Sequence, residues 1–217
     1  MAKLKMALVG CGGMGTRHLY GLRELVQSPF ANVELAALGD IKQENVEMAA
    51  VKGEELLGYA PQTFTDLEAM AKAIPDLAMV DVVTDPSVHH TVVCQALDLG
   101  LHVLVEKPMG VTVAECQTLC DAVERSGLTL QVGHMKRFDP GIAFARDFIA
   151  EEMGQLMALK AWYCDSTYRY TMTDNLQLLP LHSADAYKPA GDPKADKRQY
   201  FMLPHGSHLV DMTRCLA

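Results

Sequence analysis

The sequence predicts an α/β protein that begins with a Rossmann fold, a doubly wound parallel sheet, and continues into the start of an α+β domain. From residue 4 to about residue 133, short apolar runs alternate with helical patterns, as repeated βα units do. One of these runs, LAMVDVVT over 77–84, is almost continuously apolar, which is typical of a parallel strand covered on both faces. A glycine-rich stretch, VGCGGMGTRH over 9–18, lies between the first run and the first helical pattern.

Each element follows from a local pattern of residues. Apolar runs predict strands, and they are found at 5–10, 33–40, 63–65, 77–84, 101–108 and 128–133. Helical spacing predicts helices, and it is found at 15–27, 42–57, 66–73, 88–99 and 113–126. Thr65, Ser87 and the Thr112–Glu115 capping box are expected to cap three of these helices. Gly100 and Gly127 are expected to end two of them.

The regular alternation of predicted strands and helices stops after Gly133. A helix is expected over 141–153, stopped by Gly154, and then a long strand over 155–165. Residues 165–200 have no clear period and are expected to form an extended loop or lid. The end of the sequence starts another helix. Because one strand cannot bury itself, the second domain is expected to be incomplete.

Composition narrows the classes of partner. The 217 residues are 49% hydrophobic and 21% charged, which is enough apolar material for a core. A net charge of -8 without a basic run excludes nucleic acid and acidic membrane surfaces as expected partners. No apolar run approaches the ~18 residues of a membrane span. The first residues look like a strand and not a signal peptide, and no CxxC pair occurs, so a cytoplasmic protein is expected.

The glycine-rich stretch fits the spacing GxGxxG at Gly10, Gly12 and Gly15. Gly10 allows a tight turn, Gly12 lets the backbone approach a pyrophosphate, and Gly15 lets the helix pack closely on the strand. The second strand ends at Asp40, whose carboxylate can accept hydrogen bonds from both hydroxyls of an adenosine ribose. A glycine turn beside a solvated Asp40 is the alternative.

The same residues predict the cofactor. A 2′-phosphate would meet the like charge of Asp40, so NAD is expected and NADP is disfavoured. Gly13, Met14 and Ile41, which adjoin these positions, are also expected to contact the cofactor.

Three further stretches end predicted strands, namely TDPSVHH over 84–90, EKPMG over 106–110 and GHMKRFDP over 133–140. Ligands of open α/β sheets bind at the carboxyl ends of the strands. We therefore expect all three stretches at the crevice of the glycine loop.

With these stretches and HGSHLVD over 205–211, the chain resembles the glucose-fructose oxidoreductase and inositol dehydrogenase family of NAD(P)-dependent sugar oxidoreductases. The resemblance implies hydride transfer between NAD(H) and a secondary alcohol or ketone of a sugar, cyclitol or related polyol. Lys107 is implied as the catalytic lysine, preceding a cis bond to Pro108. His208 is implied as the general base or acid, supported by Asp211. Such a lysine stabilises a developing alkoxide while the histidine takes its proton.

The resemblance also implies contacts around the cofactor. The residues concerned are Thr84, Pro86, His90, Glu106, Lys107 and Arg137. Arg137 is implied to be either structural or next to the cofactor. Of the adjacent His89 and His90, one at most is expected to be functional, since they cannot share a helix face. His18 and His134 are expected to be structural.

One position departs from the family pattern. Where the family often has an Asp four residues before the histidine, this chain has Pro204, so His205 or the lid would supply that role, or the site is altered. No metal is expected, because no cysteine or carboxylate cluster completes the His205–His208 pair.

The resemblance divides the chain into a dinucleotide-binding domain over 1–133 and, over 134–217, the beginning of a substrate and oligomerisation domain that is truncated relative to relatives. A homo-oligomer is expected for a full-length chain. Two alternatives to an enzyme stay open: a non-catalytic dinucleotide-binding sensor or regulatory relative, and an inactive truncated fragment.

Overall fold

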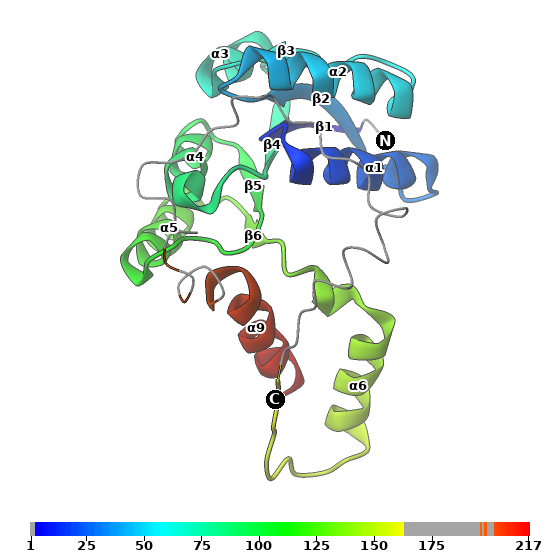
Figure 1. Cartoon of the computed structure of the whole chain (residues 1–217), viewed down its shortest axis with the longest axis vertical. Coiled ribbons are helices and arrows are strands. Elements are labelled where there is room, and N and C mark those ends of the chain that lie inside the picture. Colours follow the sequence, from blue (N-terminus) through cyan, green and yellow to red (C-terminus); the bar gives the residue numbers. More distant parts are fainter. Residues whose placement is uncertain (1–2, 163–195, 197, 199–201) are drawn as a thin grey trace. The chain divides into compact units, whose positions relative to one another are not determined.

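A computed structural model describes residues 3–162, 196, 198 and 202–217. The described residues fall into two compact units, one ending at Val132 and one beginning at Gly133 (Figure 1). The expected role of residues 134–217 as the beginning of a substrate domain stays a prediction.

The first unit is built on one parallel sheet of six strands in the order β3-β2-β1-β4-β5-β6. The strands are β1 (Leu4–Val9), β2 (Val33–Gly39), β3 (Gln62–Phe64), β4 (Leu77–Val82), β5 (His102–Val105) and β6 (Leu130–Val132). Every neighbouring pair is parallel. The strand order reverses between β1 and β4, which opens a crevice at their carboxyl ends. The predicted doubly wound Rossmann fold is confirmed.

Helices cover both faces of this sheet, and each face has its own apolar core. The helices are α1 (Gly13–Gln27), α2 (Gln43–Leu57), α3 (Leu67–Ala73), α4 (Pro86–Asp98) and α5 (Val113–Ser126). Met6 and Leu8 of β1 pack with α1 and α2, whereas the alternate residues Ala7 and Val9 pack with the other three helices. This alternation is why β1 is apolar from Met6 to Val9, where both faces of the strand are covered.

Two of the predicted helix caps are wrong by one or two residues. The side chain of Asp66, and not Thr65, accepts the Ala69 N–H at 2.7 Å to cap α3. Asp85, and not Ser87, caps α4 by accepting the Ser87 N–H at 3.0 Å. Pro86 takes the first helical position of α4, because its fixed φ suits that position, so the cap lies before it.

The predicted start of α5 and the glycines expected to end two helices are confirmed, whereas the helix expected over 141–153 ends earlier, at Glu151 with its cap at Glu152. The capping box of Thr112 and Glu115 starts α5. Gly127 ends α5 at a φ of 67°, and Gly100 follows α4 at a φ of 79°, a left-handed region in which glycine has no steric penalty.

The second unit is helical in the residues described. Its elements are the 3₁₀ turn η1 (Met135–Phe138), α6 (Pro140–Glu151), the π-helical turn η2 (Met202–Gly206) and α9 (Ser207–Leu216). The strand expected over 155–165 is wrong for 155–162, which form no strand, because no neighbouring strand pairs with them in the described part of the unit. The expected lid over 165–200 lies outside the described residues, except for Asp196 and Arg198.

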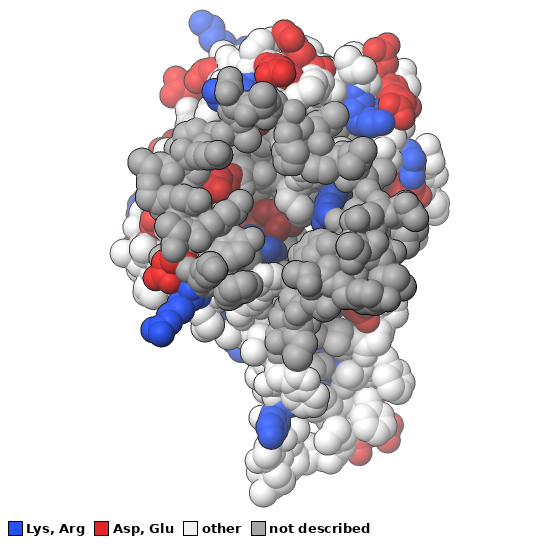
Figure 2. Space-filling model, in the orientation of Figure 1, with Lys and Arg blue, Asp and Glu red and all other residues white. Residues whose placement is uncertain are grey.

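The second unit exposes large apolar side chains. Phe138 and Phe144 are 74% and 71% exposed, and α6 buries none of its residues. Figure 2 shows a mostly uncharged surface around α6. Among the described residues, no helix combines the length and the apolar character that crossing a bilayer requires.

We expect Gly15→Ala to destabilise the first unit. A Cβ at position 15 would overlap the backbone oxygen of Gly10, so the start of α1 must move away from β1. The expected loss in the free energy of unfolding is about 2–4 kcal/mol, as for other overpacking substitutions. Urea unfolding measures it.

Gly21→Ala is the matched control in the same helix. A Cβ there would meet no atom within 4 Å. Alanine in an exposed helix interior is expected to stabilise the protein by about 0.5–1 kcal/mol. Equal effects of the two substitutions would contradict the close packing at Gly15.

Candidate functional site

A cleft of about 510 Å³ opens in the first unit at the carboxyl ends of β1, β2 and β4. Its walls are the glycine loop, the end of β2, the start of α3 and one side of α4. The lining residues include Gly10, Gly12, Asp40, Ile41, Thr84 and Gln95. This is the crevice at which the strand order reverses.

The three fingerprint glycines have different surroundings. Gly10 has a φ of 105°, and a Cβ there would lie 2.7 Å from the backbone carbon of Val83, so only glycine fits. Gly15 is excluded from carrying a side chain by the carbonyl of Gly10. At Gly12, in contrast, a Cβ would meet no atom of the described residues within 4 Å. Because Gly12 also lines the cleft, this open space, the cradle, is accessible to a bound group.

The start of α1 adds donors to this cradle. Gly12 is the N-cap of α1, and no side chain caps the helix there. The first amides of a helix have no partner within the helix, and its dipole favours an anion at this end. The glycine loop can therefore hold a phosphate through its backbone.

Asp40 ties the glycine loop to the end of β2. One carboxylate oxygen accepts the N–H of Cys11 at 2.8 Å, and the other accepts the N–H of Lys42 at 2.9 Å. The Asn45 amide also donates to Asp40, at 3.3 Å. A carboxylate has about four acceptor positions, so Asp40 keeps capacity for a ligand hydroxyl.

Thr84 gives a second polar position in the cleft. Its hydroxyl oxygen is buried and has no hydrogen-bond partner in the part of the chain that the structure describes. A buried polar atom without a partner is costly, so a bound ligand or water is expected to satisfy it.

Several other expected cofactor contacts, Gly13, Met14, Pro86 and His90, are not among the described residues that line this cleft. Gly13 and Met14 form the first turn of α1, with Met14 41% exposed. Pro86 and His90 belong to α4. His90 is half-buried, with its Nε2 atom 3.8 Å from the Sγ atom of Cys94.

His18, one turn into α1, joins two carboxylates. Its Nδ1 atom lies 2.6 Å from Asp81 of β4, and its Nε2 atom lies 3.4 Å from Glu106, which follows β5. Burial by itself disfavours the imidazolium, but the hydrogen bonds to Asp81 and Glu106 outweigh it and raise the pKa of His18 to about 9. Burial opposes the ionised form of Glu106 as well, yet the His18 hydrogen bond lowers the pKa of that carboxyl. These three residues form a charge cluster in which Asp81 is buried and His18 and Glu106 are partly buried.

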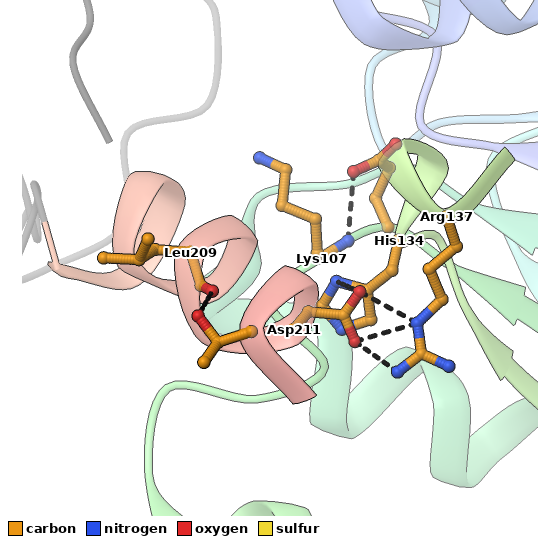
Figure 3. Close-up of polar contacts among 7 residues, drawn as sticks. Lys107, His134, Arg137, Leu209 and Asp211 are labelled. Atoms are coloured by element: carbon orange, nitrogen blue, oxygen red, sulfur yellow. Dashed lines mark hydrogen bonds and ion pairs between the residues drawn. The ribbon is translucent and has the colours of Figure 1, made fainter. Parts of the chain in front are cut away.

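Glu106 also holds the backbone of Lys107. Its second oxygen accepts the Lys107 N–H at 3.0 Å, as Figure 3 shows. The Lys107–Pro108 peptide bond is cis, as expected. The buried His89 contacts the carbonyls of Pro108 and Thr84.

The second unit has its own polar cluster. The Arg137 guanidinium donates to both carboxylate oxygens of Asp211 on α9, with Nε at 3.0 and 2.9 Å (Figure 3). His134 lies 3.7 Å from the same carboxylate. The Arg137 hydrogen bonds hold the pKa of Asp211 below its ordinary value. Arg137 thus fastens η1 to α9.

The candidate base is on the same helix. His208 lies one turn before Asp211 and is 8% exposed, and it belongs to a hollow of about 450 Å³ in the second unit. His205 lies in η2 and is half-buried. The side chain of Pro204 lies outside the described residues. No group of three or more His, Cys, Asp or Glu residues able to hold a metal occurs in the described part of the chain.

The sequence analysis missed Asp81 and the role of His89. A signal for Asp81 existed, because a single carboxylate inside the apolar run over 77–84 requires a buried partner. No local signal distinguishes His89 from His90, since their burial depends on how α4 is rotated against the sheet.

The comparison with known families agrees with this geometry. Residues 4–134 match the GFO/IDH/MocA model, described as an oxidoreductase family with an NAD-binding Rossmann fold. The chain belongs to this family. Its first unit is therefore an NAD-binding Rossmann domain, and the expected resemblance is confirmed.

Individual relatives include a rhizopine catabolism protein and an inositol dehydrogenase. The rhizopine catabolism protein MocA of Rhizobium meliloti is 31% identical over 166 residues, covering 76% of this chain and 48% of the relative. A scyllo-inositol 2-dehydrogenase (NAD(+)) of Bacillus subtilis (strain 168) is 29% identical over 164 residues, covering 75% and 45%. An NAD-binding protein from Listeria innocua shares the fold with a TM-score of 0.66 at 24% identity, covering 97% of this chain and 53% of that one. The chain spans less than half the length of these two curated relatives.

We expect His18→Gln to remove a pH-dependent part of the stability. The pKa of His18 rises from 6.5 in an unfolded chain to about 9 in the folded one, so the folded state binds the extra proton between these values. This contribution is complete below pH 6.5 and is lost as pH rises through 9. The expected size is about 1–3 kcal/mol.

Urea unfolding of both proteins at pH 6 and pH 9.5 measures this effect. The parent protein should lose more stability than His18→Gln over this interval. A parallel decline of both proteins would contradict the charged state of His18.

Proposed function

We propose that this chain carries the cofactor-binding part and the catalytic lysine of an NAD-dependent dehydrogenase or reductase. The substrate class is a secondary alcohol or ketone of a sugar, cyclitol or related polyol. The observation that carries the proposal is a single one: the open cradle at Gly12 lies in a cleft with Asp40 on its wall, within an NAD-binding oxidoreductase family.

The residues of the cleft fit a dinucleotide. The amides after Gly12 would hold the pyrophosphate, and Asp40 would accept hydrogen bonds from the ribose hydroxyls. The negative Asp40 disfavours a 2′-phosphate, which supports NAD over NADP. The buried Thr84 hydroxyl would gain a partner, and Gly13, Met14 and Ile41 would border the ligand. When bound, the cofactor supplies the hydride acceptor or donor.

The catalytic roles are assigned to side chains of this chain. Lys107 holds the reacting oxygen with its ammonium group and stabilises the charge that develops there. His208 is the general base that takes the hydroxyl proton, with His205 as the candidate in its place. Asp211 is held by Arg137 and lies one turn after His208, so it orients the helix α9 that carries His208.

The substrate class is supported by the relatives. The matched proteins include an inositol 2-dehydrogenase of Salmonella typhimurium, 29% identical over 154 residues, and the scyllo-inositol enzyme described above. The inositols named in these relatives carry neighbouring hydroxyl groups on a ring. A lysine and a histidine can together assist the oxidation of one such hydroxyl group to a ketone.

We expect Gly12→Ala to weaken NADH binding without weakening the fold. The new methyl group would enter open space in the free protein but would occupy the cradle of the pyrophosphate. The expected rise in the NADH dissociation constant is about tenfold or more. Calorimetric titration measures it, with Gly21→Ala as the control.

The contrary result would be unchanged NADH affinity in Gly12→Ala. That outcome would place the pyrophosphate elsewhere and remove the main support for the cleft as the cofactor site.

We expect Lys107→Met to abolish turnover while NADH affinity changes by less than about threefold. The substitution removes the ammonium group, a change that typically lowers the rate by about 10²–10⁴-fold when the group stabilises the reacting oxygen. NADH absorbance with a panel of inositols, polyols and aldoses measures turnover. Lys72→Met, at an exposed lysine of α3, is the control.

Two outcomes would contradict the proposal. Turnover that survives in Lys107→Met would remove the lysine from the mechanism. No turnover in the parent protein, with NADH bound, would favour a dinucleotide-binding protein without catalysis.

A further inference from the structure

His89 is the fully buried member of the adjacent histidine pair on α4. Its exposed fraction is 0%, and its ring lies between two loops that leave the carboxyl ends of different strands. The Nδ1 atom lies 2.8 Å from the carbonyl oxygen of Pro108, and the Nε2 atom lies 3.1 Å from the carbonyl oxygen of Thr84. The first loop follows β5, and the second follows β4.

Burying an imidazole reduces the stability of the fold unless its ring nitrogens form hydrogen bonds. Burial lowers the pKa of His89, although the hydrogen bonds to the carbonyls of Pro108 and Thr84 act in the opposite direction. Both facing atoms are carbonyl oxygens, which only accept hydrogen bonds. A ring N–H can donate to the carbonyl that it faces, and the ring lies within hydrogen-bond distance of both carbonyls, so it sets the separation of the two loops.

These two loops carry different parts of the site. Thr84 lines the cleft, and its carbonyl contacts His89. Its hydroxyl has no hydrogen-bond partner among the residues that the structure describes. Pro108 directly follows Lys107, whose N–H is held by Glu106 on the other side. His89 thus connects the wall of the cleft to the lysine loop, defined as residues 106–111.

We propose that His89 is a positioning residue that sets the location of Lys107 relative to the cofactor cleft. It reaches Lys107 through the carbonyl of Pro108 and reaches the cleft through the carbonyl of Thr84. The catalytic consequence rests on the proposed dehydrogenase function, whereas the positioning itself does not.

The experiment compares His89→Leu, His89→Gln and the parent protein. Leucine keeps much of the volume and offers no donor, whereas glutamine keeps an N–H for one carbonyl. His102→Gln is the matched control, since this exposed histidine lies at the opposite end of β5 and contacts Thr129. Circular dichroism first selects the variants that fold, and His89→Gln carries the test if His89→Leu does not.

Amide hydrogen exchange is the measurement that does not depend on catalysis. In His89→Leu we expect the amides of Lys107, Met109 and Gly110 to exchange about tenfold faster or more, because the loop loses its anchor. The amides of β5, over His102–Val105, should change by less than about threefold. His89→Gln should lie between His89→Leu and the parent protein, and His102→Gln should match the parent in the loop.

Turnover is the second measurement. We expect kcat to fall about tenfold in His89→Leu with the NADH dissociation constant changed by less than about threefold, because a displaced lysine affects the reaction more than binding. His89→Gln should recover part of kcat, and His102→Gln should retain it.

The outcomes separate this proposal from the proposed function. Unchanged exchange in the lysine loop would overturn the positioning role. Exchange that rises equally through β4 and β5 would overturn it too, in favour of a general packing role. If the parent protein shows no turnover, the dehydrogenase proposal fails while the exchange measurement still decides the role of His89.

Discussion

The close approach of α1 to the end of β1 is the constraint on which the rest of the site depends. It requires glycine at position 15, because the carbonyl of Gly10 occupies the place of a side chain there. Position 10 requires glycine for another reason, namely its φ of 105° and the nearby backbone of Val83. This approach brings the amino end of α1 to the cleft and lets the Cys11 N–H reach Asp40 of the neighbouring strand. It also carries His18, one turn on, to the sheet.

The second consequence of this packing is electrostatic. Asp81 is 2% exposed in the middle of the sheet, and an unpaired carboxylate there would be costly. The His18 imidazolium compensates it and extends the same positive charge to Glu106, which in turn holds the N–H of Lys107. A buried charge of β4 is thereby connected, through α1, to the loop that carries the proposed catalytic lysine.

The second unit is organised differently. In the residues described, its contacts depend on Arg137 and Asp211, while the aromatic side chains of η1 and α6 stay exposed. Phe144 and Phe148 stack on each other, with ring centroids 6.0 Å apart. The two curated relatives are more than twice as long as the part that this chain matches.

The sequence by itself determined the alternation of strands and helices, the glycine loop, Asp40 at the end of β2 and the capping box of α5, because each depends on residues close together in the chain. The parallel sheet follows from that alternation, since a βα repeat favours parallel pairing. The predicted cap of α4 was wrong by two residues. Asp85 and Ser87 are both suitable capping residues, and Pro86 decides between them because it occupies the first helical position. The expected strand at 155–162 was wrong because strand formation requires a partner that the local pattern does not include.

Only the tertiary structure decided the pairings of distant side chains. His18 with Asp81, and Arg137 with Asp211, are separated by 63 and 74 residues. Such pairs depend on strand order and on how each helix is rotated against its neighbours. The rotation of α4 buries His89 and leaves the adjacent His90 half-buried. No sequence pattern predicts which of the two histidines is buried.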